Sequence, residues 1–247
     1  MNDHELAAEL AAAAGRLLLQ VRAEHASATV DQRRDAGDAR SHAFLLAELA
    51  RRRPGDAVLS EEGVDDPARL AADRVWIVDP LDGTREFGEL GRDDWAVHVA
   101  LWQEGRLAAG AVALPARDLT LHTPGVALGA RPPGPPRIIV SRTRPPALAE
   151  HVRDRLGGEL VAMGSVGAKI AAIVLGAADV YVHAGGQYEW DSAAPVAVAV
   201  AAGLHASRID GSPLRYNRPD PRLPDLLVCR PELAGPALAA VSEAPPS

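Results

Sequence analysis

Two carboxylates stand three residues apart at the end of an apolar run, in the segment Trp76-Ile77-Val78-Asp79-Pro80-Leu81-Asp82-Gly83-Thr84. The run Val75–Val78 is apolar throughout, which predicts a strand that is buried on both faces. Pro80 fixes its own φ and favours an extended neighbour, so both carboxylates and the Leu81 carbonyl can turn toward one point. Oxygen ligands of this kind suit Mg²⁺, which proteins hold through carboxylates together with phosphate oxygens. The segment therefore predicts a magnesium site.

The end of the same segment, Asp82-Gly83-Thr84, is typical of a helix start. Free backbone N–H groups at such a start would bind a phosphate. An isolated D-G-T is usually a simple strand-to-helix turn, with the aspartate as N-cap and the glycine for the bend. Here the whole nine-residue segment, with its two acids, favours metal ligands and an anion site together.

Two further acidic segments could complete the site. Glu61 and Glu62 follow the short apolar run 57–60, and Asp191 comes just before a predicted helix over 192–202. The alternatives are a solvated pair for Glu61 and a helix N-cap for Asp191. Together these acids could hold two or three ions, and a metal pair about 4 Å apart can bind both the attacking and the leaving oxygen of a phosphoryl displacement.

The elements that must position these residues follow from hydrophobic spacing and from turn residues. Helices are predicted over 5–24, 40–53, 146–156, 165–176 and 192–202, and strands over 57–60, 75–78, 95–102, 107–114, 118–122, 137–141, 159–162, 179–183, 204–207 and 225–229. The segment 131–136 reads Arg-Pro-Pro-Gly-Pro-Pro and is predicted to link two halves. The first half is a predicted mixed α+β domain over 1–130 that carries most metal ligands, and the second half is a predicted α/β domain over 137–247 that contributes Asp191.

Composition excludes several classes of protein. Hydrophobic residues make up 47% of the 247 residues and charged residues 24%, which is ordinary globular usage. No apolar run approaches the roughly 18 residues of a membrane span, and the N-terminal residues include acids where a signal peptide would be basic. A single cysteine, Cys229, suits a reducing cytoplasm. The net charge of −7 argues against a nucleic-acid partner.

The acidic motifs occur in the order of a known family. Glu61-Glu62, Asp79–Thr84, Trp190-Asp191 and the later Gly211-Ser212-Pro213-Leu214 resemble the magnesium-dependent, lithium-sensitive phosphomonoesterases, a superfamily that includes inositol monophosphatase. The matches extend over about residues 35–216, which is most of the chain. The resemblance implies an α/β fold with layered α-β-α-β-α packing, and an active site between the two halves.

The resemblance also implies a role for each site residue. Two or three Mg²⁺ ions would be held by Glu61, Asp79, the Leu81 carbonyl, Asp82 and Asp191. The backbone of Asp82, Gly83 and Thr84 would hold the scissile phosphate. Thr84, paired with an upstream aspartate, would orient the attacking water. That aspartate is expected to be Asp38, although the family's usual V-T-x-A-D segment is absent here and Asp35 is an alternative.

Three features resemble the CysQ-type bisphosphate nucleotidases within this superfamily. Glu86 follows the D-G-T motif, Glu189 precedes Trp190-Asp191, and Gly164-Ser165-Val166-Gly167-Ala168-Lys169 contains the only lysine among 26 basic residues. Ser165 and Lys169 lie four residues apart on a predicted helix, so both can contact one ligand. We expect Ser165, Lys169 and Glu189 to bind substrate. The alternative for Lys169 is a solvated helix position, and Arg142 is either a substrate contact or a surface charge.

The implied activity is hydrolysis of the 3′-phosphate of 3′-phosphoadenosine 5′-phosphate, a nucleotide bisphosphate formed during sulfate assimilation. Phosphatases acting on inositol 1-phosphate or fructose 1,6-bisphosphate are the alternative enzymes. An inactive ligand-binding relative would usually have lost a metal carboxylate, and all four are present. The chain has neither a G-x-S-x-G nor an H-E-x-x-H motif, so serine-hydrolase and zinc-protease chemistry are unsupported. Relatives are often homodimers, which makes a dimer possible here.

Overall fold

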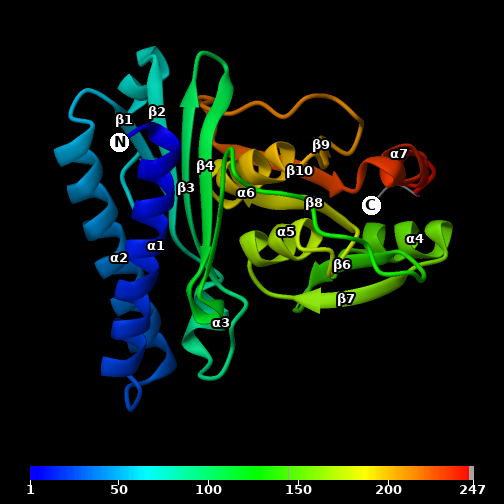
Figure 1. Ribbon diagram of the computed structural model, residues 1–247, viewed down its shortest axis with the longest axis horizontal. Helices are drawn as coiled ribbons and strands as arrows, with labels where there is room; N and C mark the ends of the chain where they lie inside the picture. Colours follow the sequence, from blue (N-terminus) through cyan, green and yellow to red (C-terminus); the bar gives the residue numbers. More distant parts are fainter. Residues whose placement is uncertain (144, 245–247) are drawn as a thin grey trace.

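The computed structural model describes residues 1–143 and 145–244 and has five layers, in the order helices, sheet, helices, sheet, helices (Figure 1). Helices α1 and α2 cover one face of the first sheet, and α4 and α7 cover the outer face of the second. Helices α5 and α6 lie between the sheets. The layered α-β-α-β-α fold expected from the sequence is therefore confirmed.

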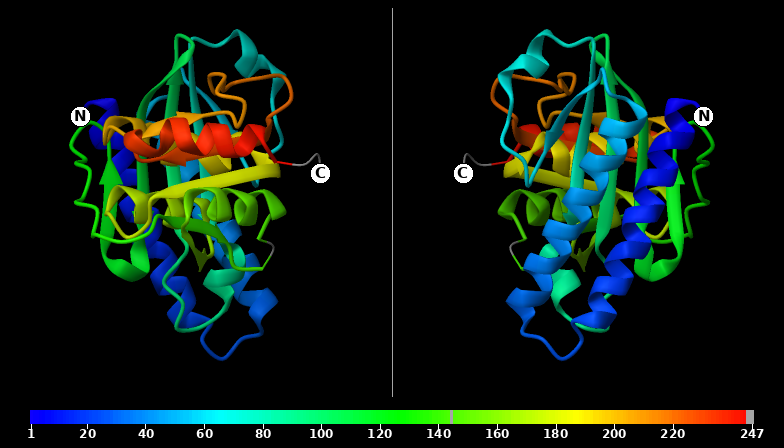
Figure 2. Two further views of the ribbon diagram at one scale, coloured as in Figure 1. Left: turned by 90° about the vertical axis from the view of Figure 1, so that its right-hand side faces the viewer. Right: turned by 90° about the vertical axis from the view of Figure 1, so that its left-hand side faces the viewer.

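The described helices are, in chain order, α1 Asp3–Glu24, α2 Val30–Arg52, α3 Thr84–Gly88, α4 Ala147–Leu156, α5 Val166–Val174, α6 Glu189–Ala201 and α7 Ala234–Ser242. None of the helices in the described ranges has the length and hydropathy needed to cross a membrane. The two N-terminal helices run side by side over the first sheet (Figure 2, right).

The strands of the first sheet follow the order β1-β2-β3-β4-β5 and span Ala57–Ser60, Arg74–Asp82, Ala96–Gln103, Arg106–Leu114 and Leu119–His122. The second sheet has the order β7-β6-β8-β10-β9 and contains β6 Arg137–Ser141, β7 Glu159–Met163, β8 Val180–Tyr188, β9 His205–Ser207 and β10 Arg222–Cys229. The β1–β2 pair is parallel, which brings the acids at the end of β2 and those that follow β1 to one edge of the sheet.

The helix predicted over 40–53 is corrected by the structure, because α2 begins ten residues earlier at Val30. Thr29 is its N-cap and forms a capping box with Gln32. The first turns contain few apolar residues, so hydrophobic spacing did not reveal them. They are fixed instead by Arg33, whose buried guanidinium donates to the carbonyls of four residues: His25, Ala26, Ala28 and Gly88.

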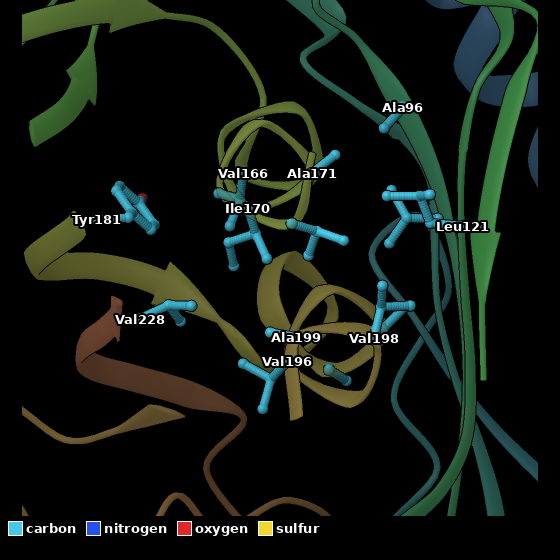
Figure 3. Close-up of a cluster of buried hydrophobic side chains, with 14 of the residues drawn as sticks. Ala96, Leu121, Val166, Ile170, Ala171, Tyr181, Val196, Val198, Ala199 and Val228 are labelled. Atoms are coloured by element: carbon cyan, nitrogen blue, oxygen red, sulfur yellow. The ribbon is translucent and has the colours of Figure 1, made fainter. Parts of the chain in front are cut away.

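Helices α5 and α6, which lie between the sheets, are rich in small residues and form a core shared with both sheets. Figure 3 shows Ile170 and Ala171 of α5 and Val198 and Ala199 of α6 between Tyr181 and Val228 on one side and Ala96 and Leu121 on the other. One hydrophobic cluster thus includes residues of both sheets. Gly110 of β4 permits this close approach, since a Cβ there would lie 2.6 Å from the Cβ of Ala197. Burial of this cluster fixes the start of α6, and with it Asp191, against the first sheet.

Candidate metal centre

Three carboxylates from two elements meet between the sheets. Asp79 and Asp82 come from the end of β2 and Asp191 from the first turn of α6, and one oxygen of each lies within 4.8 Å of the others. The β2–β3 pairing is irregular between Asp79 and Asp82. This irregularity, at Pro80-Leu81, turns both carboxylates toward α6. The predicted grouping of these three acids is observed.

The carboxylates of Asp79, Asp82 and Asp191 are crowded, and Glu61, whose side chain is partly exposed to solvent, lies beside this group but is not one of the three. Burial raises the pKa of Asp79 well above its usual value, and the nearby carboxylates of Glu61, Asp82 and Asp191 raise it further. Burial raises the pKa of Asp191 to about 7, with Asp82 adding to the effect. Burial also raises the pKa of Glu61 to about 7. Negative charge concentrated in this way favours a divalent cation.

The donor set fits such a cation. Asp79 Oδ2 is buried and has no hydrogen-bond partner among the described residues, although its Oδ1 accepts the N–H of Leu81 at 3.0 Å. A buried carboxylate oxygen without a donor is costly unless a cation satisfies it. The three grouped carboxylates offer hard oxygen ligands, which suit Mg²⁺ better than a metal that prefers thiolate or imidazole ligands.

Asp82 differs from its neighbours because donors surround it. Burial raises its pKa, but His98 and hydrogen bonds from Ser165 and Gly167 outweigh burial and hold the pKa below the usual value. The Ser165 hydroxyl donates to Asp82 Oδ2 at 2.5 Å, and the Gly167 N–H donates to the same oxygen at 2.7 Å. Asp82 therefore stays charged and has a fixed orientation toward the site.

His98 is a site residue that sequence reasoning missed, since a lone histidine on an apolar strand reads as a core residue. It is fully buried on β3, and its Nε2 lies 3.2 Å from Asp82 Oδ2. Its Nδ1 donates to the Trp190 carbonyl at 3.2 Å, next to Asp191. Only the packed structure reveals this role, since a Cβ at Gly167 would lie 2.2 Å from His98 Nε2. A glycine inside the first turn of α5 thus makes room for this imidazole.

Thr84 and Asp38 come together as predicted from the resemblance. Thr84 Oγ1 lies 3.5 Å from Asp38 Oδ1 and 3.0 Å from the Leu81 carbonyl oxygen. Asp38 lies on α2, and burial together with the charges of Glu62 and Asp35 raises its pKa to about 7. The alternative residue, Asp35, is exposed on the same helix.

Gly83 occupies a position that other residues would strain. Its φ is +85°, and a Cβ there would lie 3.1 Å from the Cβ of Ser165 and 3.3 Å from the Asp94 carbonyl oxygen. Only glycine adopts this conformation without cost and also leaves space for α5. The turn therefore places Asp82 and Thr84 on either side of a backbone that faces the start of α5.

Lys169 is not a solvated helix residue, because its side chain is 5% exposed. Its Nζ donates to the Ser165 carbonyl at 3.2 Å and lies 5.4 Å from the centre of the Tyr181 ring. Burial lowers the pKa of Lys169, whereas the charges of Asp82 and Glu86 oppose that shift. The single lysine of the chain is thus a buried ammonium beside the acidic site, and one N–H group is satisfied by the protein.

The other predicted substrate contacts have protein partners in this structure. The carboxylate of Glu189 accepts the backbone N–H groups of Asn217 and Arg218, at 2.7 and 2.9 Å, so it anchors that loop. Arg142 donates to Glu86 at 2.9 Å and to Glu89 at 2.8 Å. These ion pairs join Arg142, which directly follows β6 of the second sheet, to α3 and its C-cap.

A family model described as the inositol monophosphatase family matches residues 2–130 and 138–244. The chain belongs to the inositol monophosphatase family. The two matched stretches are separated by the Pro-rich segment, and the three carboxylates of the metal centre come from both of them.

Similar proteins carry more specific names. The chain is 56% identical over 240 residues to a 3′-phosphoadenosine 5′-phosphate phosphatase of Mycobacterium bovis, covering 94% of this chain and 90% of that protein. It is 32% identical to a 3′(2′),5′-bisphosphate nucleotidase CysQ of Salmonella typhimurium, covering 86% and 93%. The crystal structure of CysQ from Bacteroides thetaiotaomicron, also of the inositol monophosphatase family, is 28% identical with a TM-score of 0.77, covering 91% and 96%.

Proposed function

We propose that this member of the inositol monophosphatase family hydrolyses the 3′-phosphate of 3′-phosphoadenosine 5′-phosphate in a magnesium-dependent reaction. The observation that carries the proposal is the grouping of Asp79, Asp82 and Asp191 in a chain that is 56% identical to a phosphatase named for this substrate. The products would be adenosine 5′-monophosphate and inorganic phosphate. Such an enzyme would remove a by-product of sulfate assimilation.

Glu61, Asp79, Asp82, Asp191 and the Leu81 carbonyl are the proposed Mg²⁺ ligands, for two or three ions. When bound, Mg²⁺ would lower the pKa of the attacking water and offset the charge of the phosphate. The unpartnered Asp79 Oδ2 supports this ligand set, as do the raised pKa values of Asp79, Asp191 and Glu61. Sensitivity to Li⁺ is proposed with it, on the resemblance to the lithium-sensitive superfamily alone.

Thr84 and Asp38 are proposed to orient the attacking water. A hydroxyl donates one hydrogen bond, so Thr84 donates either to the Leu81 carbonyl or to Asp38. When it donates to Asp38, its lone pairs are free to accept from a water. Asp38 fixes that orientation as a carboxylate, and its pKa of about 7 allows it to receive a proton near neutral pH.

The substrate is proposed to lie between α3 and α5. The backbone of Gly83 and Thr84 would donate to the scissile phosphate. Lys169 is a buried cation that donates one N–H group to the Ser165 carbonyl, and its other N–H groups would bind the second phosphate of the nucleotide. Ser165 and Glu189 would contribute by holding Asp82 and the 217–218 loop in place. A cytoplasmic location is proposed on the sequence argument from the single Cys229, which is buried.

The test is phosphate release from three substrates compared under the same conditions. These are 3′-phosphoadenosine 5′-phosphate, inositol 1-phosphate and fructose 1,6-bisphosphate, each with Mg²⁺ and with EDTA. We expect kcat/KM to favour the nucleotide about 100-fold, which corresponds to about 2.7 kcal/mol of transition-state binding, with no release in EDTA. A preference for inositol or fructose phosphates would contradict the proposed substrate but would remain consistent with the proposed metal centre. Release that persists in EDTA would overturn the metal centre.

A further inference from the structure

Outside the metal centre, arginines gather at a pocket of about 480 Å³ beside the start of β10. Tyr188, Arg208, Arg218 and Arg222 are among its lining residues, and we call it the arginine pocket. Its size lies within the roughly 300–1,000 Å³ typical of small-molecule sites. None of the proposed metal ligands lines it. A second hollow of about 280 Å³ is also lined by Arg208, Arg218 and Arg222 and adds Arg215.

The backbone positions of these arginines are fixed by the fold. The backbone N–H of Arg218 donates to the buried Glu189, and the fully buried Arg69 donates to the Arg218 carbonyl at 2.8 Å. Arg222 is paired with Tyr188 in the β10–β8 register. The Arg208 guanidinium forms a two-point ion pair with Asp225. The backbones that present Arg218 and Arg222 are therefore fixed, whereas their side chains are exposed and free to turn toward a ligand.

The charge of the pocket is positive although the chain as a whole carries −7. Asp225 neutralises Arg208, and Asp220 is the acid among the residues that line the pocket. Among the described residues, no carboxylate lies within 4.0 Å of the Arg218 or Arg222 guanidinium. Each fork of N–H groups matches the geometry of a tetrahedral oxyanion.

We propose that the arginine pocket binds an oligophosphate anion, either free or carried by a nucleoside, as a site separate from the metal centre. Arg218 and Arg222 line both hollows and form no ion pair among the described residues, so they favour more than one phosphate group, because each guanidinium fork suits one oxyanion. The Tyr188 ring, which stacks on Trp190 with centroids 4.7 Å apart, gives the pocket a wall that could contact a base. Tyr188 also joins the pocket to the metal centre, because its N–H donates to Asp191 Oδ2 at 2.6 Å.

Calorimetric binding in EDTA tests the proposal, because removal of the cation leaves the proposed metal centre with crowded negative charge that repels a phosphate. The probes are pyrophosphate, adenosine 5′-diphosphate and adenosine. We expect both phosphates to bind and adenosine to fail. Tighter binding of adenosine 5′-diphosphate assigns the site to nucleotides, whereas equal binding assigns it to the free anion. Absence of binding by both phosphates overturns the proposal.

Matched variants locate the bound anion. Replacing both arginines, Arg218→Ala with Arg222→Ala, should weaken binding at least about tenfold, since two charge-assisted contacts are lost. Arg218→Lys with Arg222→Lys should retain part of the affinity, which separates a specific contact from misfolding. Arg16→Ala removes a charge from α1 that is also exposed, and it should have no effect. An equal loss in Arg16→Ala would show bulk charge attraction and overturn the proposal.

Two further variants separate this site from the proposed substrate site. Lys169→Ala and Asp191→Asn each alter the metal centre or its surroundings without changing a guanidinium of the arginine pocket. Both should retain adenosine 5′-diphosphate binding in EDTA. Loss of binding in Lys169→Ala would place the ligand in the substrate site and overturn the separate pocket, whatever the outcome of the activity assays.

Discussion

The hydroxyl of Ser165 donates to the carboxylate of Asp82 at 2.5 Å, across 83 positions in the chain. Asp82 ends a strand of the first sheet, and Ser165 is the N-cap of α5, which lies between the sheets. The same Ser165 oxygen accepts the Ala168 N–H at 2.9 Å. One side chain therefore sets both the start of α5 and the orientation of a proposed metal ligand.

Ser165→Ala should weaken Mg²⁺ binding more than it weakens the fold. The variant loses a hydrogen bond to a charged group, worth about 1.5–3 kcal/mol, and residues that orient metal ligands typically change affinity by about 10–100-fold. The measurement is the Mg²⁺ concentration that gives half-maximal kcat/KM. Ser242→Ala, which removes an exposed hydroxyl at the end of α7, is the matched control. An unchanged Mg²⁺ requirement in Ser165→Ala would contradict this role.

His98→Leu should also raise the Mg²⁺ requirement, by about 10–100-fold. The imidazole contacts Asp82 through Nε2 and the Trp190 carbonyl through Nδ1, so it aligns the ligands of β2 with those of α6. Thermal unfolding in EDTA is measured in parallel, because leucine at a fully buried site can repack. If Tm falls while the Mg²⁺ requirement stays constant, His98 is part of the core only.

Much of the fold could be predicted because each element has a local signature. The buried run Val75–Val78 and the alanine-rich helix α1 both have the expected periodicity. The start of α2 could not be predicted in this way. Its first turns are polar and are held by Arg33, which donates to the Gly88 carbonyl 55 residues away as well as to nearby carbonyls, a contact that no local pattern reveals.

Some residues of the site could likewise be predicted from local sequence, and others could not. Asp79, Asp82 and Asp191 were predictable, because acids directly after a buried strand or before a helix stand at an element end. The partners of Asp82 were not, since His98 and Gly167 come together only when β3 packs against α5. The sequence identifies Glu86 only as a residue typical of CysQ-type enzymes. Its ion pair with Arg142 is visible only in the structure.

Lys169→Ala should discriminate between substrates. A buried ammonium beside the site adds attraction for the second phosphate of a nucleotide bisphosphate, which a simple phosphomonoester lacks. We expect KM for 3′-phosphoadenosine 5′-phosphate to rise about tenfold or more, with a smaller change for p-nitrophenyl phosphate. Lys169→Arg retains the charge but needs more space than this buried position offers, so it should restore little. Equal effects on both substrates would rule out a contact to the second phosphate.

Asp191→Asn should abolish most activity and yet stabilise the protein in EDTA. The amide removes one of several crowded negative charges, a crowding that adds to burial in raising the pKa of Asp191 to about 7, and the Asn Oδ1 can still accept the N–H of Tyr188, the N-cap of α6. Sites built for a cation are commonly strained without it. We expect Tm in EDTA to rise by a few degrees and the stabilisation by Mg²⁺ to disappear. A variant with lower Tm in EDTA and normal stabilisation by Mg²⁺ would contradict Asp191 as a ligand.

Stability in EDTA should fall as pH rises from about 5 to 8. Asp38, Glu61 and Asp191 each have a folded-state pKa of about 7, above the ordinary carboxylate value. Between the unfolded and folded pKa values the native state binds more protons than the unfolded state, so the free energy of unfolding decreases with pH. Mg²⁺ competes with those protons, so the increase in Tm that it produces should be larger at pH 8 than at pH 6. Thermal melts across this range, with EDTA and with saturating Mg²⁺, measure both trends.

The Asp191→Asn variant should show a shallower decline in EDTA, because one of the three groups no longer titrates. A wild-type Tm in EDTA that rises with pH would mean that these carboxylates are not crowded in the folded protein.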